Sequence, residues 1–277
     1  MKIDVIVVLF NPKDTYLPHL KKYADIFSNV FFMDNSTEKN DFLVEELKKN
    51  PKNHIIDLHG NQGIAFALKK GMEISIKDSA DYVLTMDQDS IFPIDRYSEI
   101  MAVLTKNPYY GIIGLNFNCN NKGLIVEDTD WWLTSGNFIN VSLYQKIDKG
   151  FDERLFIDAV DQDICHSFHK KGYRIGFIPG ISIIHEIGQP KEFKILGKIF
   201  HTLNYNPIRY YYIFRNNYYL YYHKDRQFFK SGLHFAKYNM FFKILLLEKN
   251  KIPKLKACRL GKKDGKRGTL GPCPHKL

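Results

Sequence analysis

Apolar residues in the first ninety positions occur in four short runs, each followed by polar residues. Residues 3–10, 30–33, 55–58 and 82–86 are rich in Val, Ile, Leu, Phe and Met, as in strands that are buried on both faces. Between them, residues 18–27, 41–49 and 64–77 carry apolar positions at helical spacing. This order predicts an α/β fold with a mostly parallel central sheet.

Each of these four predicted strands ends at a polar cluster. Asn11, Asp34, Asn61 and Asp87 follow the four strands in turn. Polar residues are common after strands because turns favour them. In open α/β sheets, however, the carboxyl ends of the strands also form the edge where ligands bind. We therefore expect these four residues to line one crevice.

The second half of the chain is less regular. Strands are predicted at residues 112–117, 131–139, 173–177 and 181–184, and a helix at residues 156–171 that ends before Gly172. Residues 205–222 are crowded with tyrosine, and residues 228–247 have the spacing of an amphipathic helix. We expect a main domain over residues 1–200, with a nucleotide-binding half (1–90) and an acceptor half (91–200). A helical, aromatic and Lys/Arg-rich extension follows over residues 201–277.

Composition and length suit a globular chain without disulfide or zinc scaffolding. The 277 residues are 44% hydrophobic and 25% charged. The four cysteines form no CxxC pair, and Cys273 with His275 is only a weak hint of a metal site, so reduced thiols in a cytoplasmic protein are expected. We find neither a signal-peptide pattern at the start nor an apolar stretch long enough to span a membrane.

The net charge of +10 is concentrated at the C-terminus. Residues 249–277 hold ten Lys/Arg and one acid, Asp264, which gives this stretch a charge of +9. Such a segment favours an anionic surface, and membrane headgroups or a polyanionic acceptor are the first candidates. Because no nucleic-acid motif accompanies the charge, we do not expect nucleic acid as a partner.

Asp87-Gln88-Asp89 is the strongest candidate for chemistry. In an extended segment, residues i and i+2 point to the same face, so two carboxylates would repel each other unless a cation lies between them. Mg²⁺ and Mn²⁺ prefer oxygen ligands and share their coordination shell with substrate phosphates. A lone DxD is also found in solvated turns, but here it follows a predicted buried strand.

Three acids, Asp158, Asp161 and Asp163, crowd the start of the predicted helix at residues 156–171. One acid there is explained by N-capping, which suits Asp158, and by the helix dipole. Three exceed that need, and a carboxylate in this place can remove a proton from an acceptor hydroxyl. The alternatives of capping and catalysis stay open at this point.

Other candidates are weaker. His185 follows an apolar run and is either a structural residue or a metal ligand. Arg209 and Arg215 lie in the tyrosine-rich stretch, where a guanidinium can contact phosphate or pack among aromatic rings.

Together these stretches resemble the family 2 glycosyltransferases, and more narrowly the bacterial rhamnosyltransferases among them. The resemblance runs from Val5 to about Asn217, and the order and spacing of its motifs carry it. The matching stretches are Val8-Leu9-Phe10-Asn11-Pro12, Met33-Asp34-Asn35-Ser36, Asn61-Gln62-Gly63-Ile64-Ala65, Leu84-Thr85-Met86-Asp87-Gln88-Asp89-Ser90, Thr134-Ser135-Gly136, Phe156-Ile157-Asp158-Ala159-Val160-Asp161, His185-Glu186-Ile187-Gly188 and Tyr212-Ile213-Phe214-Arg215-Asn216.

The resemblance implies a GT-A (Rossmann-like) fold, Mn²⁺ or Mg²⁺ as cofactor and an inverting transfer. It implies that Asp161 is the catalytic base and that Asp87, Asp89 and His185 hold the metal. Val160 stands where many members carry a glutamate, which leaves the roles among the three nearby acids open. The donor site is expected at Phe10, Asn11, Asp34, Asn61, Gly63, Asp87, Gln88, Asp89 and Arg215, and the acceptor site at Trp132, Ser135, Gly136 and Asp158.

The resemblance also implies partners. The expected donor is dTDP-β-L-rhamnose and the acceptor a saccharide or lipid-linked saccharide, with the basic C-terminus in peripheral contact with the inner face of the cytoplasmic membrane. A homo-oligomer is compatible with the sequence. The alternatives are a UDP-hexose donor, a nucleotidyltransferase, which would carry a Gly-rich basic phosphate loop that is missing here, and a non-catalytic carbohydrate- or membrane-binding protein.

Overall fold

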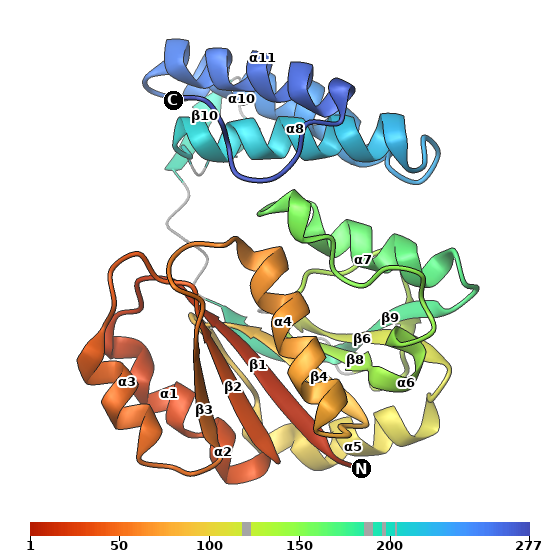
Figure 1. Cartoon of the computed structure of the whole chain (residues 1–277). Helices are drawn as coiled ribbons and strands as arrows, with labels where there is room; N and C mark the ends of the chain where they lie inside the picture. Colours follow the sequence, from red (N-terminus) through yellow and green to blue (C-terminus); the bar gives the residue numbers. More distant parts are fainter. Residues whose placement is uncertain (118–122, 186–190, 196–197, 203) are drawn as a thin grey trace. The chain divides into compact units, whose positions relative to one another are not determined.

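The computed structural model describes residues 1–117, 123–185, 191–195, 198–202 and 204–277 (Figure 1). The chain forms two compact units. The first contains Met1–Glu153 and Val160–Glu186, and the second contains Arg154–Ala159 and Ile187–Leu277. The second unit thus includes residues 154–159, a stretch that the sequence pattern assigns to the main domain.

The first unit is built on a mostly parallel sheet, as predicted. Its described strands follow the order β3-β2-β1-β4-β8-β6-β9-β5, with β7 paired to β9. The pairs β1–β2, β1–β4, β2–β3 and β6–β9 are parallel, whereas β8 runs antiparallel between β4 and β6. The bounds are β1 Ile3–Leu9, β2 Asn29–Asp34, β3 Asn53–Asp57, β4 Tyr82–Asp87, β5 Ser90–Ile91, β6 Tyr110–Phe117, β7 Glu127–Asp128, β8 Asn137–Asn140 and β9 Arg174–His185.

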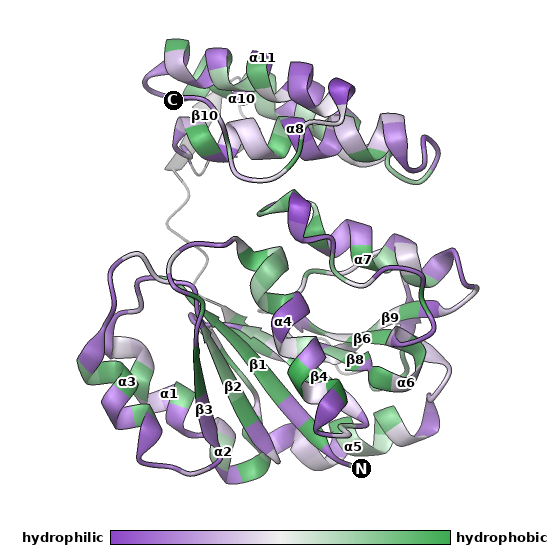
Figure 2. Cartoon of the chain, in the orientation of Figure 1, coloured by the Kyte–Doolittle hydropathy of each residue, from purple (hydrophilic) through white to green (hydrophobic). Residues whose placement is uncertain are grey.

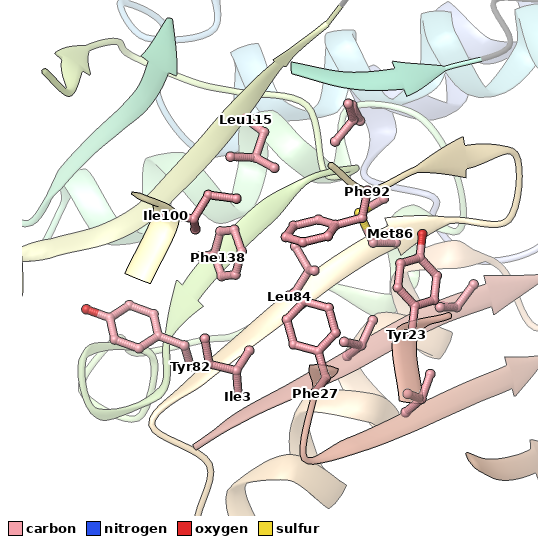
Figure 3. Packing of buried hydrophobic residues seen from close by; sticks show 14 of the residues in the cluster. Ile3, Tyr23, Phe27, Tyr82, Leu84, Met86, Phe92, Ile100, Leu115 and Phe138 are labelled. Atoms are coloured by element: carbon pink, nitrogen blue, oxygen red, sulfur yellow. The ribbon is translucent and has the colours of Figure 1, made fainter. Parts of the chain in front are cut away.

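Helices pack on both faces of the strands β1, β2 and β4, which explains why apolar residues dominate them. The odd positions of β1, from Ile3 to Leu9, join one core cluster with residues of α1, α2, α3 and α5, part of which Figure 3 shows. On the other face, Ile6 lies against Gly71 of α4, where a Cβ atom would stand 2.6 Å from the Ile6 Cδ1 atom. The helices are α1 Leu17–Lys21, α2 Tyr23–Ile26, α3 Asp41–Lys48, α4 Ile64–Lys77, α5 Tyr97–Lys106, α6 Val141–Tyr144 and α7 Val160–His169, with 3₁₀ turns at Asp14–Tyr16, Ile94–Arg96 and Glu153–Leu155.

Two predicted elements begin later in the structure than the sequence pattern indicates, and the strands predicted at residues 173–177 and 181–184 form the single strand β9. The strand expected at residues 131–139 begins only at Asn137, because Trp132 turns its ring onto Gly114 and donates its indole N–H to the Leu115 carbonyl at 2.8 Å. The helix expected at residues 156–171 begins only at Val160. Asp158 is therefore not its N-cap, and Phe156, Asp158 and Ala159 have positive φ angles of 65°, 66° and 60°.

The second unit holds the predicted helical extension. A hairpin of β10 (Lys191–Ile195) and β11 (Lys198–Thr202) precedes α8 (Pro207–His223), α9 (Lys230–His234), a π-helical turn (Phe235–Met240), α10 (Phe241–Leu247) and α11 (Lys251–Arg267). Helices α8 and α11 lie side by side (Figure 1). Gly261 and Gly265 of α11 allow this, since Cβ atoms there would stand 2.3 and 2.2 Å from backbone carbonyl oxygens of α8.

Polar residues dominate the exposed side of α11, as the hydropathy colouring shows (Figure 2). The exposed cations of this helix are Lys251, Lys256, Arg259, Lys262, Lys263, Lys266 and Arg267. No helix among the described residues is long and apolar enough to cross a membrane.

Candidate active site

The loop after β1 is tied to the loop after β2 by Asn11. Its amide oxygen accepts hydrogen bonds from the backbone N–H groups of Thr37 and Glu38, both at 3.0 Å, and its own N–H donates to the Ser36 hydroxyl at 2.9 Å. Asn11 has a φ of 46°, a left-handed conformation that asparagine tolerates better than most residues. The first two predicted strand-end clusters therefore do meet.

The third cluster joins them through Asn35, which the sequence analysis had not singled out. The Asn35 side chain accepts a hydrogen bond from the N–H of Gln62 at 2.7 Å and donates to the Asn61 side chain at 3.3 Å. Asp34, which precedes it, is buried and accepts from the N–H of Ser36 at 3.2 Å. The only sequence signal for Asn35 was its place in the polar cluster that ends β2.

Helix α4 begins at this same edge of the sheet. Its N-cap is Gly63, which has a φ of 88° and supplies no side-chain hydrogen bond to the helix. The first N–H groups of a helix have no partner within it and carry a partial positive charge. This helix start can therefore bind an anion such as a phosphate group.

Asp87 is the last residue of β4, and Gln88 and Asp89 follow it beside these loops. Gln88 forms two hydrogen bonds with the backbone of Phe10, accepting from its N–H at 2.8 Å and donating to its carbonyl at 3.0 Å. The Gln88 carbonyl in turn is 2.8 Å from the His19 Nε2 atom. Gln88 thus joins the ends of β1 and β4, and the half-buried Asp87 and Asp89 flank it.

Ser135 and Gly136, the expected acceptor residues, brace the same segment. The Ser135 hydroxyl accepts from the N–H of Asp87 at 3.0 Å and donates to the Ser90 hydroxyl at 2.9 Å. Gly136, with a φ of 77°, donates its N–H to the Thr85 carbonyl at 2.8 Å. Trp132, the third expected acceptor residue, stacks on Phe177 with ring centroids 4.1 Å apart.

The pairing of β5 with β9 brings His185 to the metal candidates. His185 lies opposite Ser90 in the sheet register, and Ser90 directly follows Asp89. Residues that are nearly a hundred positions apart in the sequence are thereby neighbours in the sheet. The His185 side chain and residues 186–188 lie outside the described part of the chain. Among the side chains that are described, no group of three or more His, Cys, Asp or Glu gathers as a metal cluster. Two carboxylates with a neighbouring histidine position fit Mn²⁺ or Mg²⁺ by ligand type.

The three acids near α7 differ in their surroundings. Asp163 is buried, whereas Asp161, in the first turn of α7, is half-buried and accepts from the N–H of Gln162 at 2.9 Å. Asp158 belongs to the second unit, where Arg209 donates to it at 3.0 and 3.2 Å. Burial raises the pKa of Asp158, and Arg209 opposes that rise. Of the three, Asp161 is the half-buried acid of the first unit.

Arg215, an expected donor contact, lies in the interior of the second unit. Its side chain is fully buried, and its guanidinium donates to the Leu155 carbonyl at 2.7 Å, to the Arg154 carbonyl at 3.3 Å and to the Gly271 carbonyl. A guanidinium has five N–H donors in a fixed fork, and here they face three backbone oxygens and the side-chain oxygen of Asn216, which accepts from Nε at 2.8 Å. We therefore do not retain Arg215 in the donor site.

The chain is similar to known glycosyltransferases in sequence and in fold. The curated dTDP-rhamnosyl transferase RfbF of Shigella flexneri is 26% identical over 287 residues, covering 93% of this chain and 95% of that protein. A crystal structure of S. aureus TarS 1-349 in complex with UDP-GlcNAc has a TM-score of 0.58 at 14% identity, covering 97% of this chain and 92% of that one.

A second solved structure supports the same fold. GalNAc-T7 with UDP, GalNAc and Mn²⁺ has a TM-score of 0.57 at 11% identity, covering 88% of this chain and 57% of that one. These likenesses confirm the predicted GT-A fold with its helical C-terminal region. The sequence profile of glycosyl transferase family 2 matches residues 4–169, which is more than half of the chain. The protein therefore belongs to glycosyl transferase family 2.

Proposed function

We propose that this glycosyltransferase moves L-rhamnose from dTDP-β-L-rhamnose to a hydroxyl of a saccharide, with inversion at the anomeric carbon. The observation that carries the proposal is the meeting of the β1–β4 strand ends around Asp87 and Asp89. The donor sugar is supported by the relative from Shigella flexneri, a dTDP-rhamnosyl transferase that aligns along almost the whole chain.

The donor diphosphate is proposed to bind where β4 and α4 meet. Asp87, Asp89 and His185 would hold Mn²⁺ or Mg²⁺, and GalNAc-T7, a fold relative, was crystallised with Mn²⁺. When bound, the metal neutralises charge that develops on the departing diphosphate. The free N–H groups at the start of α4, after Asn61 and Gly63, suit the same phosphates. Phe10, Asn11 and Asp34 line the nucleoside end of the crevice.

Asp161 is proposed as the general base. Its carboxylate takes the proton of the acceptor hydroxyl while that oxygen attacks the anomeric carbon and the bond to the dTDP oxygen breaks. The transition state resembles an oxocarbenium ion, and a single displacement gives an α-L-rhamnoside. Trp132, Ser135 and Gly136 remain the proposed acceptor side of the crevice.

A panel of nucleotide sugars tests this function. The protein is incubated with dTDP-rhamnose, UDP-glucose, UDP-galactose or UDP-GlcNAc and either Mn²⁺ or Mg²⁺, and the released nucleoside diphosphate is measured. Release from dTDP-rhamnose alone is expected, with water taking the place of the acceptor hydroxyl. Release only from a UDP-hexose would replace the donor assignment, and no release from any donor would favour a non-catalytic binding protein.

The acceptor is proposed to be lipid-linked, with the protein resting on the inner face of the cytoplasmic membrane. The exposed cations of α11 suit anionic headgroups, and Phe235, Tyr238, Phe242 and Leu246 are exposed at helical spacing on the stretch from α9 to α10. A helical surface with lysines and exposed aromatic residues is typical of interfacial binding.

Deletion of residues 249–277 would be a poor test of this contact, because α11 packs against α8 and its loss would expose the core of the second unit. Substitution of the exposed Lys262, Lys263 and Lys266 by glutamine leaves Gly261 and Gly265, where α11 approaches α8, unchanged. The variant is expected to lose cosedimentation with vesicles containing phosphatidylglycerol. Unchanged cosedimentation would exclude α11 as the contact.

A further inference from the structure

Residues 154–159 are held by helix α8, from which they are separated by about fifty residues of sequence. The Asn216 Nδ2 atom, with its two N–H donors, lies within hydrogen-bond distance of three backbone carbonyls of this segment, those of Leu155 at 2.9 Å, Ile157 at 2.7 Å and Asp158 at 2.8 Å. Arg215, the preceding residue, donates to the carbonyls of Arg154 and Leu155. Both donors are buried, so no water competes for these carbonyl oxygens.

Side chains of the segment are fixed by the same helix. Arg209 binds the Asp158 carboxylate at 3.0 Å, and the Phe156 ring stacks on Tyr212 at 5.0 Å with an interplanar angle of 11°. At the start of the segment, Arg154 donates to the Tyr219 hydroxyl at 3.3 Å. One face of α8, over three turns, thus contacts nearly every residue from 154 to 158.

The backbone of the segment is in a conformation that its residues do not favour. Phe156, Asp158 and Ala159 all have φ near +60°, although none of them is glycine. Left to local preference, the sequence predicts that a helix begins at residue 156. Such a conformation persists only where its surroundings over-determine it, and such segments concentrate at active sites. Asn216 and Arg215 supply those surroundings, because they bind backbone carbonyl groups of the segment. These carbonyl groups would point in other directions if the segment were helical.

We propose that Asn216 and Arg215 are positioning residues for the transfer reaction. They set the path of residues 154–159, and the chain then continues through Val160 to Asp161 in the first turn of α7. The orientation of that first turn, and with it the Asp161 carboxylate, depends on where the segment ends. This inference rests on the proposed function, because it concerns the base of that reaction.

Asn216→Ala tests the inference, with Asn217→Ala as the matched control. Both asparagines lie in the buried part of α8, but among the described residues the Asn217 amide donates only to the Ile213 carbonyl of its own helix, at 2.8 Å. The readouts are kcat for transfer, the KM and the separately titrated Kd for the donor, and the midpoint of urea unfolding. We expect Asn216→Ala to lower kcat at least tenfold with the donor Kd changed less than twofold. Asn217→Ala should keep kcat within twofold at a similar loss of stability.

Two results would overturn the inference. One is a kcat of the folded Asn216→Ala protein within twofold of wild type, and the other is an equal loss of kcat in both variants, which would indicate a general effect of weakening α8. If Asn216→Ala does not fold, Arg209→Gln serves instead, since Arg209 is half-exposed and its substitution removes the ion pair that holds Asp158. A kcat for Arg209→Gln within twofold of wild type would then count against the proposal.

The same experiment separates this inference from the proposed function. Wild-type protein that transfers no sugar from any donor would refute the function. Active wild-type protein with a fully active Asn216→Ala variant would refute the positioning role and leave the function intact.

Discussion

The close approach of α11 to α8 predicts that Gly265→Ala destabilises the second unit. A Cβ atom added at Gly265 would stand 2.2 Å from the Arg215 carbonyl oxygen and 2.9 Å from the Tyr218 Cβ atom. Both of these atoms belong to or adjoin the backbone, so no side-chain rotation relieves the clash. The two helices must move apart locally by about 1 Å before the contact reaches an ordinary van der Waals distance.

Two opposing contributions determine how much Gly265→Ala changes the free energy of unfolding. Alanine is favoured over glycine in a helix by about 1 kcal/mol, which alone would stabilise the variant. Overpacking of a tightly packed interface costs about 1–3 kcal/mol. Because the displaced atom is a backbone oxygen, we take the upper part of that range and expect a net loss of about 1–2 kcal/mol. The sign of the change therefore reports which term is larger.

Urea unfolding followed by tyrosine fluorescence measures this loss, and Lys263→Ala on the exposed side of α11 is the control. The control should stay within about 0.5 kcal/mol of wild type, as exposed substitutions usually do. A Gly265→Ala protein that is more stable than wild type would show that helix propensity dominates, and the proposed packing of α8 on α11 would then be wrong.

Three further predictions concern the site and the pH dependence of stability. Asp161→Asn should lower kcat by about 10²–10⁴-fold without changing donor affinity, and a kcat within threefold of wild type would place the base elsewhere. A chelator should abolish transfer, and added Mn²⁺ or Mg²⁺ should restore it. An Asp89→Asn protein should need a higher metal concentration for half-maximal activity. Transfer that persists in the chelator would exclude a metal-dependent reaction. Burial and the neighbouring Asp78 raise the pKa of Asp4 to about 6. The neutral acid is therefore favoured in the fold, and stability falls as pH rises from about 4 to 6. Asp4→Asn should then stabilise the protein by about 1–2 kcal/mol at pH 7 and not at pH 4, as thermal unfolding at both pH values would show.

The first four strands and the crevice at their ends could be predicted from sequence because the signals are local. Apolar residues dominate each strand, and each run stops at residues such as Asn11 or Asp34 that favour turns. The parallel order then follows from the alternation with helices. The hydrogen bonds of Asn35 and Gln88 were not predicted, because they depend on the lateral order of the strands, and sequence spacing alone does not give that order.

The start of α7 could not be predicted for a different physical reason. Residues 156–159 carry a helical pattern, and the groups that override it, Asn216 and Arg215, lie about sixty residues further along the chain. Tertiary hydrogen bonds to buried carbonyl groups routinely outweigh a local preference of a few tenths of a kcal/mol per residue. A helix prediction made from local pattern was therefore bound to extend too far here.

The guanidinium group of Arg215 suits two roles, binding of a donor phosphate and binding of backbone carbonyl groups. Phosphate oxygens and backbone carbonyl oxygens are both acceptors, so the forked guanidinium suits either. The surroundings separate the two cases: Arg215 lies over the rings of Tyr211 and Tyr212, and its own carbonyl abuts Gly265 of α11. Its backbone is thus fixed by the helix packing, while its side chain fixes residues 154 and 155. The packing of α8 on α11 and the path of residues 154–159 are therefore linked through one residue, and the proposed positioning of Asp161 rests on that link.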